Sequence, residues 1–340
     1  MKGDLPGQIK AWWMHMDAST TQLQQREVPL PSPGPGQVLV RMHAASLNRG
    51  EFLLKHGLHG AAGSWKAIGS EGAGEVVAVA PDVQSLQVGQ RVMGRCSGAF
   101  AQYALMQASE AMPLPERLSW SQGASVPLTF LVAYDMLVQQ GGLQPDRPAG
   151  SVPKWVLVNG VTSGVGVATL QLAKALGARV IGTSGSQAKL DLLQPLGLDF
   201  GLLTRSADFA PRVLEITQQH GADLIVNTVG GSVLAENLRA AAFEARLAVV
   251  GYVDGVVHAQ LDLEMLHAKR LCMYGVSNKL RSQAQRAAAV PHFVRDVLPA
   301  LSDGRITPQI DSVFAFDELP QAKDRMEASS HIGKLVLSLD

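Results

Sequence analysis

The stretch VLVNGVTSGVG, residues Val156–Gly166, decides the predicted fold because an apolar, strand-like run leads directly into a turn of small residues. Apolar helical periodicity resumes in VATLQLAKALGA, residues 167–178. A strand that feeds a glycine-rich turn at the start of a helix leaves backbone N–H groups at the positive end of the helix dipole, where phosphate binds. The turn therefore predicts a nucleotide site inside an α/β domain.

Strand and helix patterns alternate on both sides of this turn, from about Ser121 onwards. The expected strands are Lys154–Asn159, Arg179–Thr183, Phe200–Leu203, Asp223–Asn227, Leu247–Val250 and Cys272–Gly275. Helices such as Val165–Leu176 and Gln187–Leu196 are expected between them. This alternation predicts a Rossmann fold, a doubly wound parallel sheet.

The first part of the chain, residues 1–125, instead shows short apolar segments broken by glycine and proline, which predicts a mainly β, barrel-like domain. A chain of 340 residues is long enough for two domains. In the tail, a helical pattern precedes a final strand, which we expect to return to the barrel. The predicted domains are therefore 1–125 completed by 304–340, and 126–303 as the cofactor-binding domain.

The charges are balanced, with 29 Lys and Arg against 29 Asp and Glu and no block of one sign. This balance predicts no nucleic-acid partner and no anionic membrane partner. Because the N-terminus lacks an apolar leader core and no apolar window reaches 18 residues, we expect a cytoplasmic protein. Cys96 and Cys272 are too few for a disulfide framework, and both are predicted to be buried small hydrophobic residues.

The glycine-rich turn does not match a P-loop, because no Lys-Ser or Lys-Thr pair follows its glycines. It also lacks a full G-x-G-x-x-G, since Val161 and Ser163 hold the first two glycine positions. Its place between a strand and a helix nevertheless favours a dinucleotide. A plain turn that needs glycine for close packing remains the alternative. The candidate phosphate contacts are Ser163, Gly164, Val165 and Gly166.

The end of the second strand distinguishes NAD from NADP, because a carboxylate there binds the ribose 2′-OH of NAD and repels the 2′-phosphate of NADP. No Asp or Glu occurs from Val167 through Leu190, and Asp191 falls inside a predicted helix. The candidate contacts for a 2′-phosphate are Ser184, Gly185, Lys189 and Arg205. The sequence therefore favours NADPH, with a solvated Lys189 as the alternative.

Four stretches carry a family resemblance: GSEGAGEVVAVAPDVQSLQVGQRV (69–92), VNGVTSGVGVATLQLAKALGARVIGTSGSQAK (158–189), NTVGG (227–231) and HIGKLVL (331–337). In this combination, and over essentially its whole length, the chain resembles the medium-chain dehydrogenase/reductase superfamily. Within that superfamily it is most similar to the zinc-independent NADPH:quinone oxidoreductase group. The resemblance implies a GroES-like barrel beside the Rossmann domain, and hydride transfer from NADPH to a quinone or an α,β-unsaturated carbonyl. An enoyl thioester reductase and a non-catalytic NADPH-binding protein remain alternatives.

The resemblance also allows a test for zinc, which needs about three protein ligands in a catalytic site. Where zinc-dependent members carry ligands, this chain has Asn48 and the pair Ser70-Glu71. His56 and His59 form the other candidate pair and are expected in a solvated loop. We therefore predict no metal, and we expect Glu71 to be a buried acid that is paired or hydrogen-bonded.

Without a metal, the substrate oxygen that gains charge must be stabilised by hydrogen-bond donors, which favours conjugated acceptors. The resemblance implies that Asn48 orients substrate and nicotinamide, and that Lys334 lies near the cofactor. Tyr134 is a candidate proton donor, with a core aromatic residue as the alternative. Relatives often read FLTAY here, so Val132 replaces a threonine that the resemblance implies near the nicotinamide. Thr129, one turn earlier, is a candidate to take its place in cofactor binding.

The last expected strand, around LCMYGV (271–276), is predicted to be an exposed apolar edge. Such an edge invites pairing with another chain. As in relatives, we expect a homodimer that forms through this strand.

Overall fold

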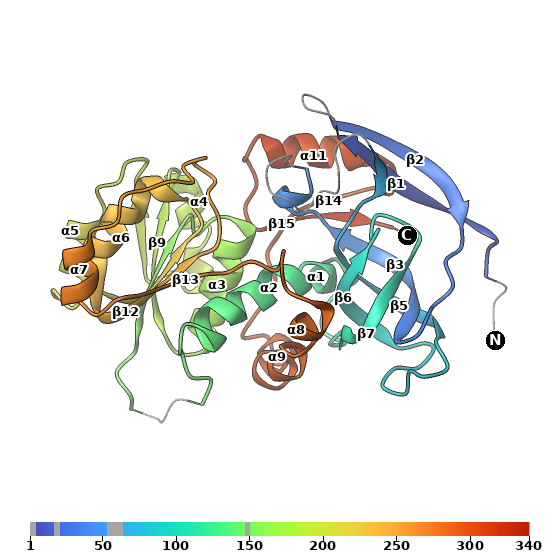
Figure 1. The fold of residues 1–340 in the computed structure, drawn as a ribbon, viewed down its shortest axis with the longest axis horizontal. Coiled ribbons are helices and arrows are strands. Elements are labelled where there is room, and N and C mark those ends of the chain that lie inside the picture. Colours follow the sequence, from blue (N-terminus) through green and yellow to red (C-terminus); the bar gives the residue numbers. More distant parts are fainter. Residues whose placement is uncertain (1–4, 17–20, 53–63, 147–149, 340) are drawn as a thin grey trace. The chain divides into compact units, whose positions relative to one another are not determined.

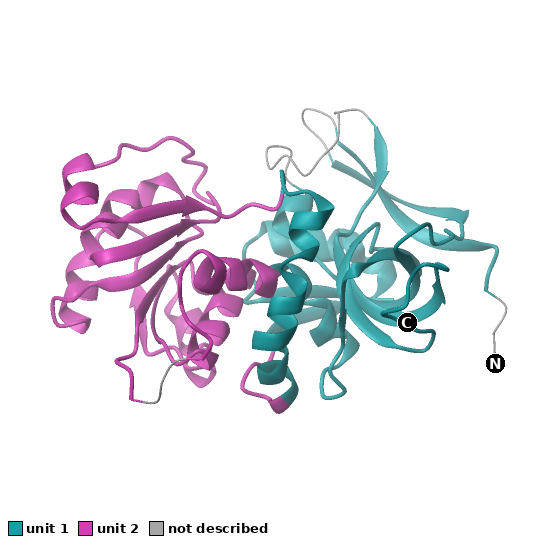
Figure 2. Cartoon of the chain, turned by 60° about the horizontal axis from the view of Figure 1, so that its bottom comes forward, with its two compact units in different colours: residues 1–128, 279–302, 308–340 teal, residues 129–278, 303–307 magenta. Residues whose placement is uncertain are grey.

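The computed structural model describes residues 5–16, 21–52, 64–146 and 150–339. The chain divides into two compact units (Figure 2). Unit 1 contains Met1–Leu128, Lys279–Ser302 and Pro308–Asp340, and unit 2 contains Thr129–Asn278 and Asp303–Thr307. These limits differ from the predicted domains mainly in one segment, because residues 279–302 group with the barrel and not with the Rossmann domain.

Unit 2 is built on a six-stranded parallel sheet in the order β10-β9-β8-β11-β12-β13. Its strands are β8 (Trp155–Asn159), β9 (Arg179–Ser184), β10 (Phe200–Leu203), β11 (Ala222–Asn227), β12 (Ala241–Val249) and β13 (Cys272–Gly275). Numbered from β8, this is the strand order 3-2-1-4-5-6 of a Rossmann fold. The predicted doubly wound sheet is confirmed, although β12 begins at Ala241 and not at Leu247.

The central strands are apolar along their length because helices cover both faces of the sheet. Every residue of β8 is buried, as a parallel sheet with two covered faces requires. Figure 1 shows α5 (Ala210–Ile216) and α6 (Leu234–Ala240) on one side of the sheet and α3 (Gly164–Ala175) on the other. The packing of these layers buries a core that includes Leu157, Ile181 and Val213.

The predicted helix Gln187–Leu196 is shorter in the structure. Helix α4 spans Gln187–Asp191, and a separate 3₁₀ turn follows at Gln194–Leu196. Pro195 explains the break, because proline has no N–H for the helical ladder and restricts the residue before it. Helix α7 (Leu263–Ala268) lies in the sequence between β12 and β13.

Unit 1 contains a second six-stranded sheet in the order β14-β15-β3-β5-β6-β7, and β3 also pairs with β7. The strands β3, β5, β6 and β7 therefore form a closed ring, which confirms the mainly β, GroES-like domain. The strands of this sheet are β3 (Gln37–Ser46), β5 (Glu71–Val79), β6 (Arg91–Ser97), β7 (Tyr103–Pro113), β14 (Ile310–Phe314) and β15 (Lys334–Ser338). A smaller sheet joins β1 (Gln8–Met16), β2 (Thr21–Pro29) and β4 (Trp65–Ala67) in the order β2-β1-β4.

The C-terminal tail completes the barrel, as predicted. Strand β15 pairs antiparallel with β3, with Val336 opposite Ser46. Helix α11 (Leu319–Glu327) turns its apolar face to the same core as Met42 and Phe100. The tail therefore supplies both a strand and a helix to unit 1.

Helices α8 (Gln283–Ala287), α9 (Val290–Asp296) and α10 (Leu298–Asp303) follow the Rossmann sheet in sequence. Charged contacts explain why this segment groups with unit 1. Arg286 of α8 donates to both carboxylate oxygens of Glu110 on β7, at 3.2–3.3 Å. Helix α1 (Trp120–Ala124) also belongs to unit 1, and α2 (Pro127–Tyr134) begins there and continues into unit 2.

The two cysteines lie in different environments. Cys96 is 7% exposed, which confirms the predicted burial. Cys272 is exposed, so the prediction of a buried residue was wrong there. It lies on β13, which ends the strand order of the parallel sheet within the described residues. Among the described residues, no helix combines the length and the apolar character needed to span a bilayer.

Candidate active site

A buried carboxylate at the start of β5 organises the polar side chains of unit 1. Glu71 has no solvent exposure. Its Oε1 accepts hydrogen bonds from Ser46 Oγ at 2.6 Å, Asn48 Nδ2 at 2.9 Å and Lys334 Nζ at 3.0 Å. Its Oε2 accepts from the backbone N–H of Leu128 at 2.7 Å. The expectation that Glu71 is a buried, hydrogen-bonded acid is confirmed.

Lys334, the first residue of β15, brings a positive charge into this cluster. Besides Glu71, its Nζ donates to the carbonyl oxygen of Leu47 at 2.8 Å and to Asn48 Oδ1 at 2.7 Å. An ammonium has three N–H donors, so all of them are used inside unit 1. Its predicted contact with a cofactor stays a prediction, whereas its role in holding Asn48 is visible in the hydrogen bonds.

Asn48 is fixed at both ends of its amide, because Oδ1 accepts from Lys334 and Nδ2 donates to Glu71. These two partners also settle which end of the amide is oxygen and which is nitrogen. The side chain is half-buried, and its second Nδ2–H has no partner among the described residues. Asn48 therefore presents a pre-oriented donor, which suits its predicted role with substrate.

A second buried acid, Glu51, was not singled out from the sequence. It is 7% exposed, and its Oε2 accepts the backbone N–H of Asn48 at 3.1 Å. Its Oε1 accepts a short hydrogen bond from Ser70 Oγ. Burial raises the pKa of Glu51 from 4.5 to about 7, although the hydrogen bonds from Ser70 and Asn48 and the charge of Lys334 lower it. The sequence feature that could have indicated Glu51 is its spacing, because an acid three residues after Asn48 is typical of a capping box.

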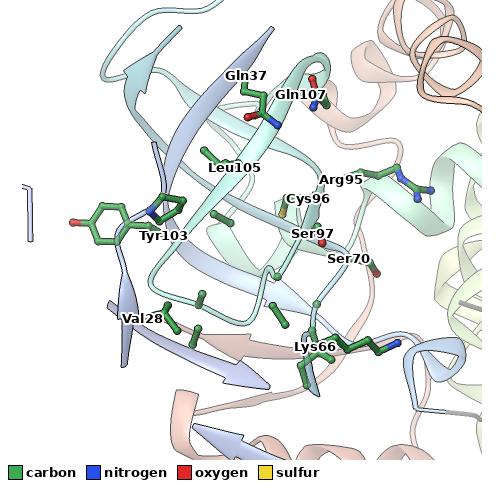
Figure 3. Close-up of a pocket in the computed structure, with 18 of the residues that line it drawn as sticks. Val28, Gln37, Lys66, Ser70, Arg95, Cys96, Ser97, Tyr103, Leu105 and Gln107 are labelled. Atoms are coloured by element: carbon green, nitrogen blue, oxygen red, sulfur yellow. The ribbon is translucent and has the colours of Figure 1, made fainter. Parts of the chain in front are cut away.

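Glu51 and Ser70 lie on the wall of a cavity of about 780 Å³ in unit 1. Figure 3 shows Ser70 and Lys66 on one side of this cavity and Val28 and Tyr103 on the opposite side. Most of the lining is apolar. The cavity can therefore accept a small, largely apolar molecule with a polar end.

The residues at the family's zinc positions do not fit a zinc ion. Asn48 and Ser70 offer amide and hydroxyl groups in place of the usual Cys and His ligands. The carboxylate of Glu71 already accepts four hydrogen bonds, one of them from the ammonium of Lys334. No group of three His, Cys, Asp or Glu within the described ranges is placed to hold a metal. His56 and His59 lie outside the described residues.

In unit 2, the glycine-rich turn has the geometry of a tight strand-to-helix connection. A Cβ on Gly166 would lie 2.4 Å from the carbonyl oxygen of Gly160, so the turn needs glycine for packing as well. Ser163 is the N-cap of α3 and accepts the N–H of Gly166 at 3.0 Å. Gly164 and Val165 are the first two residues of the helix, where backbone N–H groups have no intrahelical partner. These two N–H groups fit a phosphate.

Strands β8 and β11 are neighbours at the point where the strand order reverses, and a hydrogen bond joins the residues at their carboxyl ends. Thr228 Oγ1 donates to the carbonyl oxygen of Asn159 at 2.8 Å. After β11, Asn227 Oδ1 accepts the N–H groups of Val229 and Gly230 and fixes this second turn. Ligands of open α/β sheets bind at such a reversal, so both turns are placed for a dinucleotide.

The residues predicted for a 2′-phosphate come together at the end of β9. A Cβ on Gly185 would lie 3.1 Å from Cγ of Arg205, so the Arg205 side chain lies against the Gly185 backbone. Ser184 Oγ accepts the N–H of Ser186 at 3.2 Å. Lys189 is half-buried in the adjoining helix α4, and Arg205 is exposed. Asp191, by contrast, lies on α4 and accepts from Gln187 at 2.7 Å.

The candidates on α2 are mostly buried. Tyr134 is 2% exposed and Thr129 is 3% exposed, whereas Val132 is half-buried. The burial of Tyr134 agrees with the alternative of a core aromatic residue. Its role as a proton donor and the substitution of Thr129 for a missing threonine stay predictions.

A Rossmann sheet beside a β-barrel completed by the C-terminal strand is the architecture of a two-domain dehydrogenase fold. The family description "Alcohol dehydrogenase GroES-like domain" matches residues 34–116, and "Zinc-binding dehydrogenase" matches residues 164–292. The chain belongs to the medium-chain dehydrogenase/reductase superfamily.

Individual relatives support this assignment. The chain is 31% identical over 310 residues to a mycocerosic acid synthase-like polyketide synthase of Mycobacterium tuberculosis; the match covers 90% of this chain but only 14% of that protein. A mycobacterial protein solved in complex with NADPH superposes with a TM-score of 0.82 at 26% identity, covering 97% of this chain and 99% of the other. A quinone oxidoreductase from Pseudomonas syringae gives 0.82 at 25% identity, with the same coverage.

Proposed function

We propose that this chain is an NADPH-dependent oxidoreductase that reduces a quinone or an α,β-unsaturated carbonyl without a metal. The observation that carries the proposal is the Asn48–Glu71–Lys334 network. In this network, Asn48, which stands at one of the family's zinc positions, is bonded to the carboxylate of Glu71, and both side chains accept from the buried ammonium of Lys334. The similarity to a quinone oxidoreductase from Pseudomonas syringae supports the substrate class.

The cofactor assignment rests on the two ends of the dinucleotide site in unit 2. Gly164 and Val165 offer backbone N–H groups to the pyrophosphate, and Lys189 and Arg205 offer positive charge to a 2′-phosphate. The NADPH complex of the mycobacterial neighbour supports the same choice. When bound, NADPH supplies the hydride.

The protein's own part in the reaction is to orient the acceptor and stabilise the charge that develops on its oxygen. The second Nδ2–H of Asn48 is suited to donate to that oxygen, and Lys334 places a positive charge 2.7 Å behind Asn48 Oδ1. A conjugated acceptor spreads the incoming charge over several atoms. A hydrogen-bond donor therefore suffices for quinones and enones, whereas a simple ketone concentrates the charge on one oxygen.

Enoyl thioester reduction is a second candidate, favoured by the similarity to a polyketide synthase along 90% of this chain. An enoyl thioester is also a conjugated carbonyl, so the same network would serve it. Its carrier arm is longer and, when it is phosphopantetheine, carries a phosphate. The two candidates therefore differ in the acceptor's tail and not in the reacting atoms.

Steady-state NADPH oxidation against a small quinone, an enal and crotonyl thioester tests the proposal. We expect turnover with at least one of the three, and Asn48→Ala to lower kcat by about 10- to 100-fold while leaving NADPH affinity within twofold. A wild-type protein that binds NADPH but turns over none of the three would favour the non-catalytic alternative. Preference for crotonyl thioester over the quinone would select the second candidate.

We further propose a homodimer that forms through β13, the edge strand of the parallel sheet. Cys272 on this strand is exposed, and so are several apolar side chains of unit 2, including Val253 at 65% and Leu263 at 68%. An edge with exposed apolar groups favours association. Light scattering at micromolar concentration should give twice the mass of one chain, and a monomer would contradict this proposal.

A further inference from the structure

Two carboxylates line the cavity of unit 1, and their surroundings differ. Glu110 is 4% exposed and is paired with the guanidinium groups of Arg95 and Arg286. Glu51 makes no ion pair among the described residues, and its carboxylate accepts only from the Ser70 hydroxyl and the Asn48 N–H. Glu110 is therefore bonded to two guanidinium groups, whereas no cation is bonded to the Glu51 carboxylate in the described part of the chain.

Charged groups reach Glu51 from several elements, and burial still outweighs them. Lys334 on β15 favours the carboxylate form, and Glu71 on β5 opposes it. The charge of Glu51 also acts on Lys66 of β4 and on Cys96 of β6. The pKa of Glu51 is raised to about 7, mainly because the charged form is desolvated. At neutral pH, a large fraction of Glu51 therefore holds a proton beside the cavity.

Two other candidate site residues, Lys334 and the predicted proton donor Tyr134, are less suited to give a proton. All three N–H groups of Lys334 are used by unit 1. Tyr134 is 2% exposed. Ser70, by contrast, is half-buried, lines the cavity and is hydrogen-bonded to Glu51. A hydroxyl both donates and accepts, so Ser70 can pass a proton from a carboxylic acid to a bound molecule.

We propose that Glu51 stores the proton that completes the reduction and delivers it through the Ser70 hydroxyl. The inference rests on the proposed function. Hydride adds to the β-carbon of the conjugated acceptor, and the C=C electron pair moves toward the carbonyl oxygen. The proton of Ser70 Oγ then goes to the resulting enolate, and the carboxyl proton of Glu51 replaces it on Ser70. The acceptor has gained one hydride and one proton, and the Glu51 carboxylate recovers a proton from water.

The first test uses the protein without cofactor or substrate. Carbon NMR of glutamate labelled at the carboxyl carbon should show one resonance that titrates near pH 7. This resonance should disappear in Glu51→Gln and persist in Glu116→Gln, the matched control, whose side chain is exposed in the same unit. A wild-type spectrum in which every glutamate titrates below pH 5.5 would overturn the inference, as would a resonance near pH 7 that persists in Glu51→Gln.

The second test is the pH profile of turnover. Wild-type kcat should fall as pH rises above 7, because the carboxyl proton is lost. Glu51→Gln should lower kcat at pH 6 by about 100-fold, the lower range for general acid catalysis, and should remove the fall above pH 7. Ser70→Ala should lower kcat similarly while the Glu51 resonance near pH 7 remains. Glu116→Gln should match the wild type throughout.

The outcomes separate this inference from the proposed function. An active Glu51→Gln variant that keeps both the wild-type rate and the wild-type pH profile overturns the proton route and leaves the oxidoreductase assignment intact. A wild type that turns over no acceptor overturns the assignment and the proton route with it. If Glu51→Gln does not fold, Ser70→Ala decides, because full activity in that variant contradicts delivery through the hydroxyl.

Discussion

Lys334 Nζ lies 3.0 Å from Glu71 Oε1, and the two side chains are 6% and 0% exposed. This buried ion pair joins the C-terminal strand β15 to the start of β5 across 263 positions of sequence. Asn48 contacts both partners, so the pair also fixes the side chain that we propose to face the substrate. Stability and the orientation of Asn48 are therefore coupled.

Removing the ammonium of this pair should destabilise the protein strongly. Lys334→Met leaves the Glu71 carboxylate buried without its cation, which costs about 3–5 kcal/mol when one partner of a buried pair is lost. The matched control is Lys154→Met, whose pair with Asp223 is 57% exposed on the lysine side. That change should cost less than about 1 kcal/mol. Urea denaturation at pH 7 measures both, and equal losses would contradict the account.

Lys189→Ala should weaken NADPH binding by about 10- to 100-fold, because a charge-assisted contact with the 2′-phosphate contributes roughly 1.5–3 kcal/mol. Arg205→Ala should act in the same direction, since Arg205 lies against Gly185 at the same strand end. NADH lacks this phosphate and should be unaffected.

Dissociation constants for both cofactors, at one stated salt concentration, give the measurement for this pair of variants. Arg212→Ala is the control, because this arginine is exposed on α5 and paired with Glu215. If Lys189→Ala weakens NADH as much as NADPH, Lys189 supports the fold and not the phosphate. A wild type that prefers NADH would reverse the cofactor assignment.

The protonation of Glu51 should be visible in stability. Its pKa of about 7 in the folded protein exceeds its ordinary value of 4.5, so the folded state binds the proton more tightly. Stability present below pH 4.5 is therefore lost as pH rises to about 7, by about 3 kcal/mol in all. Glu51→Gln removes this loss. The difference in unfolding free energy between variant and wild type should shift by that amount between pH 4 and pH 9, and a constant difference would contradict it.

Zinc should be absent from the purified protein. Asn48 and Ser70 are poor zinc ligands, and Glu71 is engaged by Lys334. Elemental analysis of protein prepared without added metal should give less than about 0.1 zinc per chain, and a chelator should leave turnover unchanged. Stoichiometric zinc whose removal abolishes turnover would refute the metal-free mechanism.

Local sequence patterns predicted the parallel sheet well and the small antiparallel sheet poorly. Each Rossmann strand is an apolar run between turn residues, so covered faces leave a clear signal. Strand β2 is TQLQQREVP, a polar segment whose residues are mostly half-buried or exposed. Its pairing with β1 holds it in the sheet, and composition alone does not reveal that pairing.

The candidate site also contains residues that the sequence predicts and one that it does not. Ser184, Gly185 and Lys189 are near neighbours in sequence, so their grouping was predictable from one stretch. Glu51 was missed because the groups that surround it, including Ser70 and Lys334, are distant in sequence and meet it only in the folded barrel. Residues that are grouped within one stretch could be predicted from the sequence, whereas an acid whose burial depends on tertiary packing could not.

The central claim is a metal-free reduction that depends on conjugation in the acceptor. The most direct measurement compares NADPH oxidation by chelator-treated protein with a conjugated enone and with the saturated ketone of the same carbon skeleton. The account predicts oxidation of one NADPH per enone reduced, and less than about 1% of that rate with the saturated ketone. Equal rates with both acceptors, or activity that returns only when zinc is added, would contradict it.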